Sequence, residues 1–328
     1  MARSLKVGVL GHGTIGRRVA SAVADAPDMI LVGIVATRPT PRLLSALAGG
    51  ALLFTETGHE GFAAAGFPVA GGLNDLLGRI DVIIDCGPRG SAASRRAQYD
   101  AHGVGTLLHG GEDADITVCD FTSVARCEGS RRGVARIASC NTTALARIVA
   151  AALRAGDIRS VTAVLVRAST DSDKAAKGSP NAPLAHLGST HHAQDLRRLF
   201  PTVSFETVGC HVPTNRGHLA HVFIDWVEAP SPERVVAHLA SGEGLQVLDG
   251  GDGGLDELSR SRCAADGDAH DVLIWRRGIE TVGKRTRLAA AVHMEAVVIP
   301  DTLAGIRYLA KQSITPAMEL RASEGVQC

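Results

Sequence analysis

A glycine-rich turn between an apolar strand and a helix is the feature that most limits what this chain can fold into. Residues 5–10 form a short apolar run, residues 17–25 have helical spacing, and residues 11–16 between them read GHGTIG. A GxGxxG turn in this context is typical of a dinucleotide site, in which the phosphates lie at the N-terminus of the helix. A glycine turn of an ordinary α/β protein is the alternative interpretation.

Each glycine of the turn has its own geometric role in the dinucleotide interpretation. Gly11 permits the tight turn, Gly13 lets a pyrophosphate approach the backbone, and Gly16 lets the helix pack closely on the strand. We therefore expect the first half of the chain to be a Rossmann-like, doubly wound parallel sheet. The expected cofactor-binding residues of the turn are Gly11, Gly13, Thr14, Ile15 and Gly16.

The end of the second expected strand, residues 29–35, indicates which nicotinamide cofactor the turn would hold. An NAD site places an acidic residue there for the ribose diol, whereas this chain continues with Ala36, Thr37, Arg38 and Pro39. The missing carboxylate removes repulsion of a 2′-phosphate, which Thr37 and Arg38 could bind. NADP is thus favoured, NAD stays possible, and the alternative is that Arg38 is only a solvated loop residue.

Further apolar runs extend the predicted parallel sheet. Residues 81–86 and 105–109 have the composition of buried strands, with a helix-like segment at 91–102 between them. In a doubly wound sheet the loops at the carboxyl ends of the strands line the ligand crevice. The cofactor-binding residues expected from these loops are Gly87, Pro88 and Gly110.

One cysteine, Cys140, stands where a strand-like run ends and a helix begins. The short run before it, residues 136–139, is mostly apolar, while residues 144–156 have helical spacing and end in glycine. A thiol at a helix N-terminus feels the positive end of the dipole, which lowers its pKa, and the same N–H groups can hold an oxyanion. Cys140 is therefore either a nucleophile or a buried structural cysteine.

Longer strand-like runs follow, at residues 160–167 and 218–227, and predict a second domain with a largely antiparallel sheet. A polar stretch that carries Gly and Pro joins the two runs, and we expect it to be a long functional loop. Within it, His191 and His192 favour anion binding, ahead of a structural role and of metal binding, for which the sequence offers no third ligand.

A second histidine position concerns the chemistry of Cys140. His218 follows a turn and begins an apolar run, so it is a candidate base for the thiol. His221, three residues on, competes for the same role, because a Cys–His pair is joined only by the fold.

Composition excludes several classes of partner. With 34 basic and 34 acidic side chains, 3% aromatic residues and no dense basic block, the chain is not expected to bind nucleic acid. No apolar run approaches a membrane span and the chain enters a strand without a signal peptide, so we expect a cytoplasmic protein with no membrane partner. Seven scattered cysteines without CxxC spacing favour reduced thiols, and no metal site is expected.

Several motifs taken together resemble the archaeal-type (type II) phosphorylating glyceraldehyde-3-phosphate dehydrogenases. The resemblance implies a dinucleotide-binding domain over residues 1–139, onto which the C-terminal segment 301–328 packs back, and a catalytic and oligomerisation domain over residues 140–300. The motifs keep one order from residue 5 to about residue 312 and include GHGTIGRRVA (11–20), LNDLL (73–77), HGGE (109–112), SCNTT (139–143), HHAQD (191–195), VPTNRGH (212–218) and VHMEAVVIP (292–300).

The resemblance also implies a reaction and assigns roles. Cys140 is the nucleophile and His218, rather than His221, is its partner. A small phosphorylated or anionic aldehyde, with glyceraldehyde 3-phosphate favoured, forms a thiohemiacetal, gives a thioester by hydride loss to NADP or NAD, and leaves as an acyl phosphate after attack by inorganic phosphate. Family members are typically homotetramers. The implied substrate- and phosphate-binding residues are Ser139, Asn141, Thr142, Thr143, Arg167, His191 and His192.

Departures from the family pattern keep other reactions open. The family usually has two consecutive arginines where this chain has Arg167 and Ala168, and commonly has Tyr where His12 stands. One phosphate contact is therefore in question. The alternatives are a non-phosphorylating or specialised-pathway aldehyde dehydrogenase, acting for instance on a phosphonate, an acyl-phosphate reductase, and a non-catalytic cofactor-binding paralogue.

Overall fold

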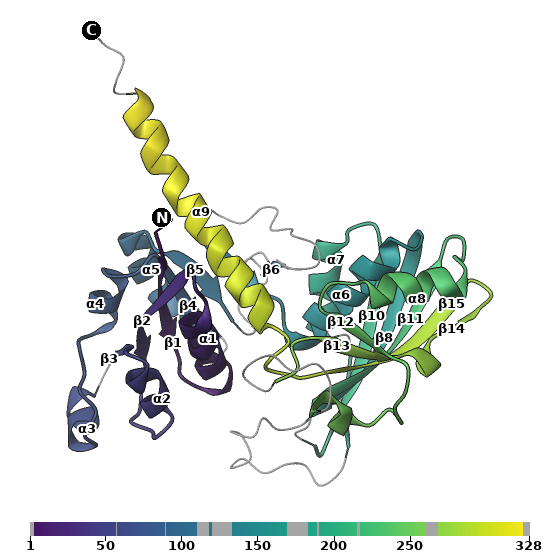
Figure 1. Ribbon diagram of the computed structural model, residues 1–328, viewed down its shortest axis with the longest axis horizontal. Helices are drawn as coiled ribbons and strands as arrows, with labels where there is room; N and C mark the ends of the chain where they lie inside the picture. The colour runs from purple at the N-terminus through teal and green to yellow at the C-terminus, as the bar shows by residue number, and fades with distance from the viewer. Residues whose placement is uncertain are drawn as a thin grey trace. The chain divides into compact units, whose positions relative to one another are not determined.

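The structure is a computed structural model that describes two compact units of the chain (Figure 1). The first unit comprises Met1–Cys119, Cys127–Ile137 and Asp301–Cys328, and the second comprises Asp120–Arg126 and Ala138–Pro300. The described residues are 3–56, 58–88, 90–109, 118–119, 133–168, 183–188, 190–214, 217–259 and 268–323, the last twelve of them as backbone only.

The first unit is built on a parallel sheet, as the sequence predicts. All pairs between its described strands run parallel. Val9 of β1 lies between Ile34 of β2 and Ile84 of β4, and all three side chains are fully buried. A strand buried on both faces explains why these segments are continuous apolar runs. Among the described residues the strand order is β3-β2-β1-β4-β5-β7-β6, with β1 Leu5–Leu10, β2 Met29–Val35, β3 Leu52–Phe54, β4 Val82–Asp85, β5 Gly105–Leu108, β6 Val118–Cys119 and β7 Val134–Ile137.

Along the chain, helices alternate with these strands and pack on the sheet. The core cluster over one part of the sheet joins Phe54, Leu76, Ile83 and Tyr99, which come from two strands and two helices. Burial of such side chains is worth about 1.5–3 kcal/mol each, which makes this cluster a main source of stability for the unit. The elements are α1 Thr14–Asp25, α2 Leu43–Ala48, α3 His59–Ala64, α4 Leu73–Leu77, the 3₁₀ helix η1 Ser91–Arg95 and α5 Arg96–His102.

The C-terminal helix α9, Ile299–Ser323, begins one residue before Pro300. Proline is tolerated in a first helical turn because the N–H that it lacks would have no partner within the helix. From Asp301 onward α9 belongs to the first unit, where Ile306 and Leu309 are fully buried and Arg307 forms a bidentate pair with Asp28.

The second unit contains a mixed, mostly antiparallel sheet, in agreement with the predicted fold class. Only the β8–β10 and β12–β13 pairs run parallel among its described strands. The order is β12-β13-β15-β11-β8-β10-β9, with β14 paired to β15; the bounds are β8 Ile158–Ala168, β9 Leu184–Ala185, β10 Ser204–Val212, β11 His218–Trp226, β12 Leu245–Leu248, β13 Val272–Trp275, β14 Glu280–Val282 and β15 Arg285–Val292.

Three helices cover one face of this sheet. On β8 the alternate residues Val161, Ala163 and Leu165 are fully buried, whereas Val164 and Val166 between them are partly exposed, so helices cover the first set only. The covering helices are α6 Cys140–Leu153, α7 His191–Leu199 and α8 Pro232–Ala240. The 3₁₀ helix η3 Leu255–Ser259 packs with Leu219 and Ala291 on the other face, and a second 3₁₀ helix, η4 Arg276–Gly278, follows β13.

Helix α7 corrects the expectation that residues 191–195 belong to a loop. Ala193, Leu196 and Leu199 are buried at helical spacing against α6 and β10, and Thr190 stands at the N-cap position. Most of its polar side chains, His191, Gln194, Arg197 and Arg198, form its exposed face, and this polarity obscures the apolar stripe in the sequence.

The cysteines also differ from the expectation of reduced thiols. Cys86, Cys140 and Cys210 are reduced, but Cys119 in β6 is disulfide-bonded, with its partner outside the described residues. Pairing depends on the fold bringing two Cα atoms to about 4.4–6.8 Å, which sequence spacing cannot reveal. No helix in the described part of the chain is long and apolar enough to cross a membrane.

Candidate functional site

The glycine turn of the first unit has the geometry of a cradle. Gly11 has φ +85°, and a Cβ at Gly16 would lie 1.8 Å from the Gly11 carbonyl oxygen, so neither position accepts a side chain. A Cβ at Gly13 would meet nothing within 4 Å. The space beside Gly13, at the N-terminus of α1, therefore fits a phosphate group that approaches the backbone.

The loop after β2 lies next to this turn. His12 Nε2 and the Arg42 carbonyl oxygen are 3.1 Å apart, which ties residues 36–42 to the turn. Thr37 and Arg38 are exposed on this loop, and no acidic residue stands in it. Its charge is thus suited to a phosphate rather than to a ribose diol.

A buried ionic network fixes the loop after β4. Asp85, at the end of β4, accepts hydrogen bonds from Arg95, Tyr99 and the Gly87 N–H at 2.8–3.2 Å. The carboxylate is 2% exposed, and burial and the Asp85 charge raise the pKa of Tyr99, so the phenol stays a donor. This network positions Gly87 and Pro88 at the carboxyl edge of the sheet.

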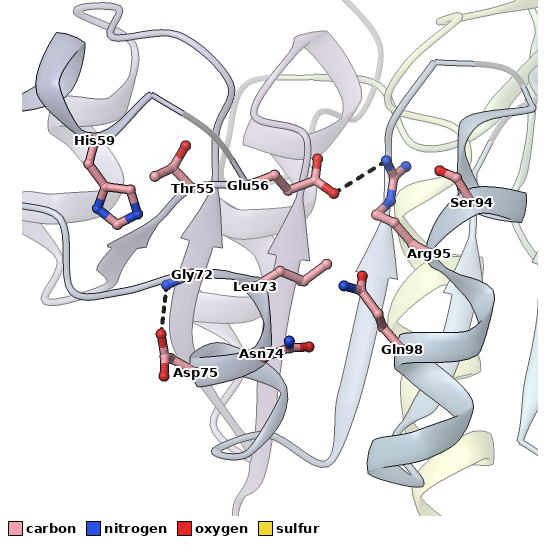
Figure 2. Close-up of a pocket in the computed structure, with 10 residues that line it drawn as sticks. All are labelled: Thr55, Glu56, His59, Gly72, Leu73, Asn74, Asp75, Ser94, Arg95 and Gln98. Carbon is pink, nitrogen blue, oxygen red and sulfur yellow. Dashed lines mark hydrogen bonds and ion pairs between the residues drawn. The ribbon is translucent and has the colours of Figure 1, made fainter.

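Figure 2 shows a polar pocket beside the same network. Glu56, which follows β3, approaches Arg95 to 3.6 Å across it, and Gly72 at the start of α4 donates to Asp75. The cavity has a volume of about 520 Å³ and is also lined by Thr55, His59, Leu73, Asn74, Ser94 and Gln98.

The remaining cofactor residue expected from sequence, Gly110, lies outside the described residues. Its neighbour His109 is 4% exposed and hydrogen-bonds through Nε2 to Thr302 of α9 at 2.9 Å. Burial lowers the pKa of His109 to about 4, so this ring is neutral near pH 7. His109 thus holds the C-terminal helix on its own unit.

In the second unit, Cys140 is the first residue of α6. Its thiol is reduced and partly buried, and the next three residues, Asn141, Thr142 and Thr143, are buried. Sequence predicts this position for the thiol, although it places the helix from residue 144. The dipole of this fourteen-residue helix favours a thiolate at its N-terminus.

His192 of α7 contacts the same turn. Its Nδ1 lies 3.0 Å from both the Ser139 and the Thr142 hydroxyl oxygens, which are themselves 3.0 Å apart. His192 is fully buried, and burial, followed by nearby His191, Arg167, His218 and His186, lowers its pKa to about 2. His191, although its ring centroid is 4.0 Å away, is exposed, so the histidine pair has one buried and one accessible member.

Three basic side chains lie on the helix-covered face of the sheet, near the carboxyl end of β8. Arg167 is in register with His211 of β10, and His218 begins β11 on the other side of β8. His218 is 4% exposed, and its Nδ1 accepts the Ala168 N–H at 2.9 Å. Since Nδ1 is an acceptor, the neutral ring carries its proton on Nε2 and is a donor there. His221 is exposed on the opposite face.

Sequence reasoning missed His211 and His186. Burial, followed by Arg167 and His186, lowers the pKa of His211, which places both histidines within electrostatic reach of Arg167. Neither residue belongs to a motif. The strand-like pattern of residues 204–212 could have placed His211 on a strand, but it does not show that His211 lies beside Arg167. Among the described residues no three His, Cys, Asp or Glu side chains are grouped to hold a metal ion, and this cluster is suited to an anion.

Comparison with known proteins identifies the family. The chain is 33% identical to a glyceraldehyde-3-phosphate dehydrogenase from Aeropyrum pernix over 98% of its own length and 96% of that protein. It belongs to the glyceraldehyde-3-phosphate dehydrogenase family. Relatives of the same name from Hyperthermus butylicus and Haloarcula marismortui are 32% and 31% identical over 99% and 98% of the chain, and 97% and 93% of their own lengths.

The glyceraldehyde-3-phosphate dehydrogenase family is also indicated by a domain match. Residues 139–247 match the glyceraldehyde 3-phosphate dehydrogenase C-terminal domain, which starts at Ser139 and includes the whole histidine cluster. Among solved structures, aspartate semialdehyde dehydrogenase II from Vibrio cholerae has a TM-score of 0.68 at 12% identity, covering 94% of this chain and 99% of that chain. This likeness shows a shared fold.

Proposed function

We propose that this protein oxidises glyceraldehyde 3-phosphate, or a very similar small phosphorylated aldehyde, through a thioester on Cys140. The observation that carries the proposal is the position of Cys140 at the N-terminus of α6. The residue before it, Ser139, contacts His192, a member of the basic cluster. Membership of the glyceraldehyde-3-phosphate dehydrogenase family supports the same chemistry.

The reaction begins with a bond from the Cys140 sulfur to the aldehyde carbon, which turns the carbonyl oxygen into an oxyanion. The N–H groups of the first turn of α6 and the Nε2–H of His218 are the donors that stabilise this charge. Loss of hydride from that carbon leaves a thioester. Inorganic phosphate then attacks the thioester carbon, and the Cys140 thiolate leaves as the acyl phosphate forms.

The basic cluster supplies the binding energy for anions. Arg167, His191 and His211 are the groups that would hold the substrate phosphate and inorganic phosphate. Arg167 supplies charge-assisted hydrogen bonds, which are about twice as strong as neutral ones, and the two histidines can donate as neutral rings. His192 is less suited to this task, since it is buried and neutral. Ser139, Asn141, Thr142 and Thr143 complete the proposed substrate site around Cys140.

A nicotinamide cofactor fits the first unit. A bound nicotinamide ring supplies the hydride acceptor. The open space at Gly13 and the acid-free loop after β2 support NADP as the preferred form, with NAD possible. The residues that would hold the cofactor are Gly11, Gly13, Thr14, Ile15, Gly16, Thr37, Arg38, Gly87, Pro88 and Gly110.

The proposal includes a cytoplasmic homotetramer. The sheet face of the second unit opposite α6, α7 and α8 carries Val208, which is 40% exposed, and the partly exposed Phe223. An apolar surface of this kind is suited to a subunit contact. Light scattering at several protein concentrations measures the assembly directly.

The test of function is NADP reduction by the purified protein with glyceraldehyde 3-phosphate, with and without inorganic phosphate. We expect turnover that requires phosphate and disappears in Cys140→Ser, while Cys210→Ser, on the opposite sheet face, keeps it. Phosphate-independent turnover would mean that water resolves the thioester. Full turnover by Cys140→Ser would exclude the thioester altogether.

A further inference from the structure

The N-terminus of α6 lacks the cap that its sequence predicts. Ser139 is the N-cap residue, and serine is among the preferred residues there because its hydroxyl accepts the N–H of the second or third helical residue. In this structure the Ser139 side chain makes no such bond. Only its carbonyl oxygen takes part in the turn, accepting the Thr143 N–H at 2.7 Å.

The Ser139 hydroxyl instead contacts two side chains, one from α6 and one from α7. It lies 3.0 Å from the Thr142 hydroxyl and 3.0 Å from His192 Nδ1, and Thr142 is equally close to that nitrogen. Each atom of this triangle has a partner within the triangle. The hydroxyl oxygen keeps acceptor capacity, but in the orientation that these contacts give it, it makes no capping bond to the first turn.

The same turn has unused hydrogen-bonding capacity. Both side-chain polar atoms of Asn141 are buried without a hydrogen-bond partner, and so is His192 Nε2. Buried polar groups are normally satisfied, so such groups indicate a place that engages a polar ligand or intermediate. Asn141 directly follows Cys140, where the proposed reaction develops negative charge.

We propose that His192 is a positioning residue that holds the Ser139 hydroxyl off the N-terminus of α6, which keeps the first-turn N–H groups available to the thiolate and oxyanion at Cys140. The inference rests on the proposed function for the identity of the oxyanion. It assigns His192 a role different from anion binding, which the neighbouring exposed His191 can serve.

The environment of His192 supports this role. Its side chain is fully buried between α6 and the sheet, on a helix anchored by Ala193 and Leu196, so the ring cannot follow a mobile substrate. Burial keeps the ring neutral, so it can hold the hydroxyls without adding charge at the site.

The experiment compares His192→Phe, Ser139→Ala and the double variant H192F/S139A. Phe keeps an aromatic ring at this position but has no nitrogen, so the Ser139 hydroxyl is free to turn and cap the helix. The primary readout is the pH dependence of Cys140 alkylation by iodoacetamide, followed by mass spectrometry of the Cys140 peptide. This readout needs no substrate, so it stands even if glyceraldehyde 3-phosphate is not turned over.

We expect the alkylation midpoint of H192F to rise by about one pH unit and that of H192F/S139A to return to the wild-type value. In steady-state assays H192F should lose about tenfold in kcat with KM for aldehyde and phosphate little changed, and the double variant should recover most of the loss. His192→Asn, whose amide can still contact Ser139, should stay near wild type and serves if the Phe variant does not fold.

Two results would overturn the inference. A double variant no better than H192F would mean that the Ser139 hydroxyl does not compete for the helix N-terminus. A rise in KM for phosphate with unchanged kcat and unchanged alkylation midpoint would make His192 an anion ligand instead.

Discussion

At the scale of single residues, one backbone N–H decides how His218 can act. The Ala168 N–H donates to His218 Nδ1, so the neutral ring presents Nε2–H to its surroundings. A backbone N–H does not depend on the side chain that follows Arg167, so alanine at this position preserves the contact. In the proposed reaction this tautomer makes His218 a donor to the oxyanion, whereas the role of base predicted from the sequence requires a ring nitrogen without a proton on the substrate side.

His218→Gln and His218→Ala separate these two roles. Glutamine can place an amide N–H near the Nε2 position, so we expect it to keep a measurable part of kcat, while alanine loses about 10²–10³-fold, the usual cost of an oxyanion donor. Single-turnover hydride transfer measures both. If glutamine is as inactive as alanine, proton transfer by His218 is required and the donor role is wrong.

In the proposed function, the preference for NADP depends on Arg38. It is exposed on the acid-free loop after β2, where a charge-assisted contact to a 2′-phosphate is worth about 1.5–3 kcal/mol. Arg38→Ala should therefore weaken NADP binding by about tenfold or more and leave NAD binding nearly unchanged. Calorimetric titration of both cofactors measures this, with Arg96→Ala as the charge-matched control. Equal losses for NADP and NAD would remove the phosphate role.

At the scale of elements, the end of β4 carries a testable link between stability and the cofactor loop. Asp85→Asn leaves the buried Arg95 charge without its carboxylate, and removing one partner of a buried pair costs about 3–5 kcal/mol. We also expect weaker NADP binding, because the Gly87 N–H loses a charged acceptor. Urea unfolding and cofactor titration measure the two effects.

The matched control for this variant is Asp100→Asn, which breaks the surface pair with Arg96 one turn away on α5. Surface pairs of this kind contribute about 0.3–0.5 kcal/mol. Equal unfolding midpoints for the two variants would show that the buried pair contributes no more than the surface one.

How well an element is predicted depends on whether its signal is local. The strands around Val9 and the turn at Gly11 are set by apolar runs and glycine geometry, so the sequence shows them clearly. Helix α7 was missed because its apolar stripe is narrow and most of its residues are polar. Likewise the Ser139–His192 contact joins residues 53 positions apart through the packing of α7 on α6, and no spacing rule contains it.

At the scale of the whole molecule, buried neutral histidines make stability depend on pH. His109 in the first unit is buried, which lowers its pKa to about 4, whereas an unfolded histidine titrates near 6.5. Between these values the unfolded chain binds a proton that the folded chain does not. Stability is therefore full above about pH 6.5 and falls as the pH drops towards 4, by ~1.4 kcal/mol per pH unit for each such group.

Urea unfolding at about pH 7 and about pH 5, with near-UV and far-UV signals followed separately, measures this loss. His109→Gln can still hydrogen-bond Thr302 but cannot take up a proton, so its first unit should lose less stability on acidification than wild type. His102→Gln, on the exposed end of α5, is the matched control and should behave as wild type. The same acid dependence in all three proteins would mean that other groups, and not His109, set the acid limit of the fold.

His192 extends the same argument to the second unit. Burial lowers its pKa further, so the second unit should stay sensitive to acid even in the His109 variant, and the two units should then unfold at different urea concentrations.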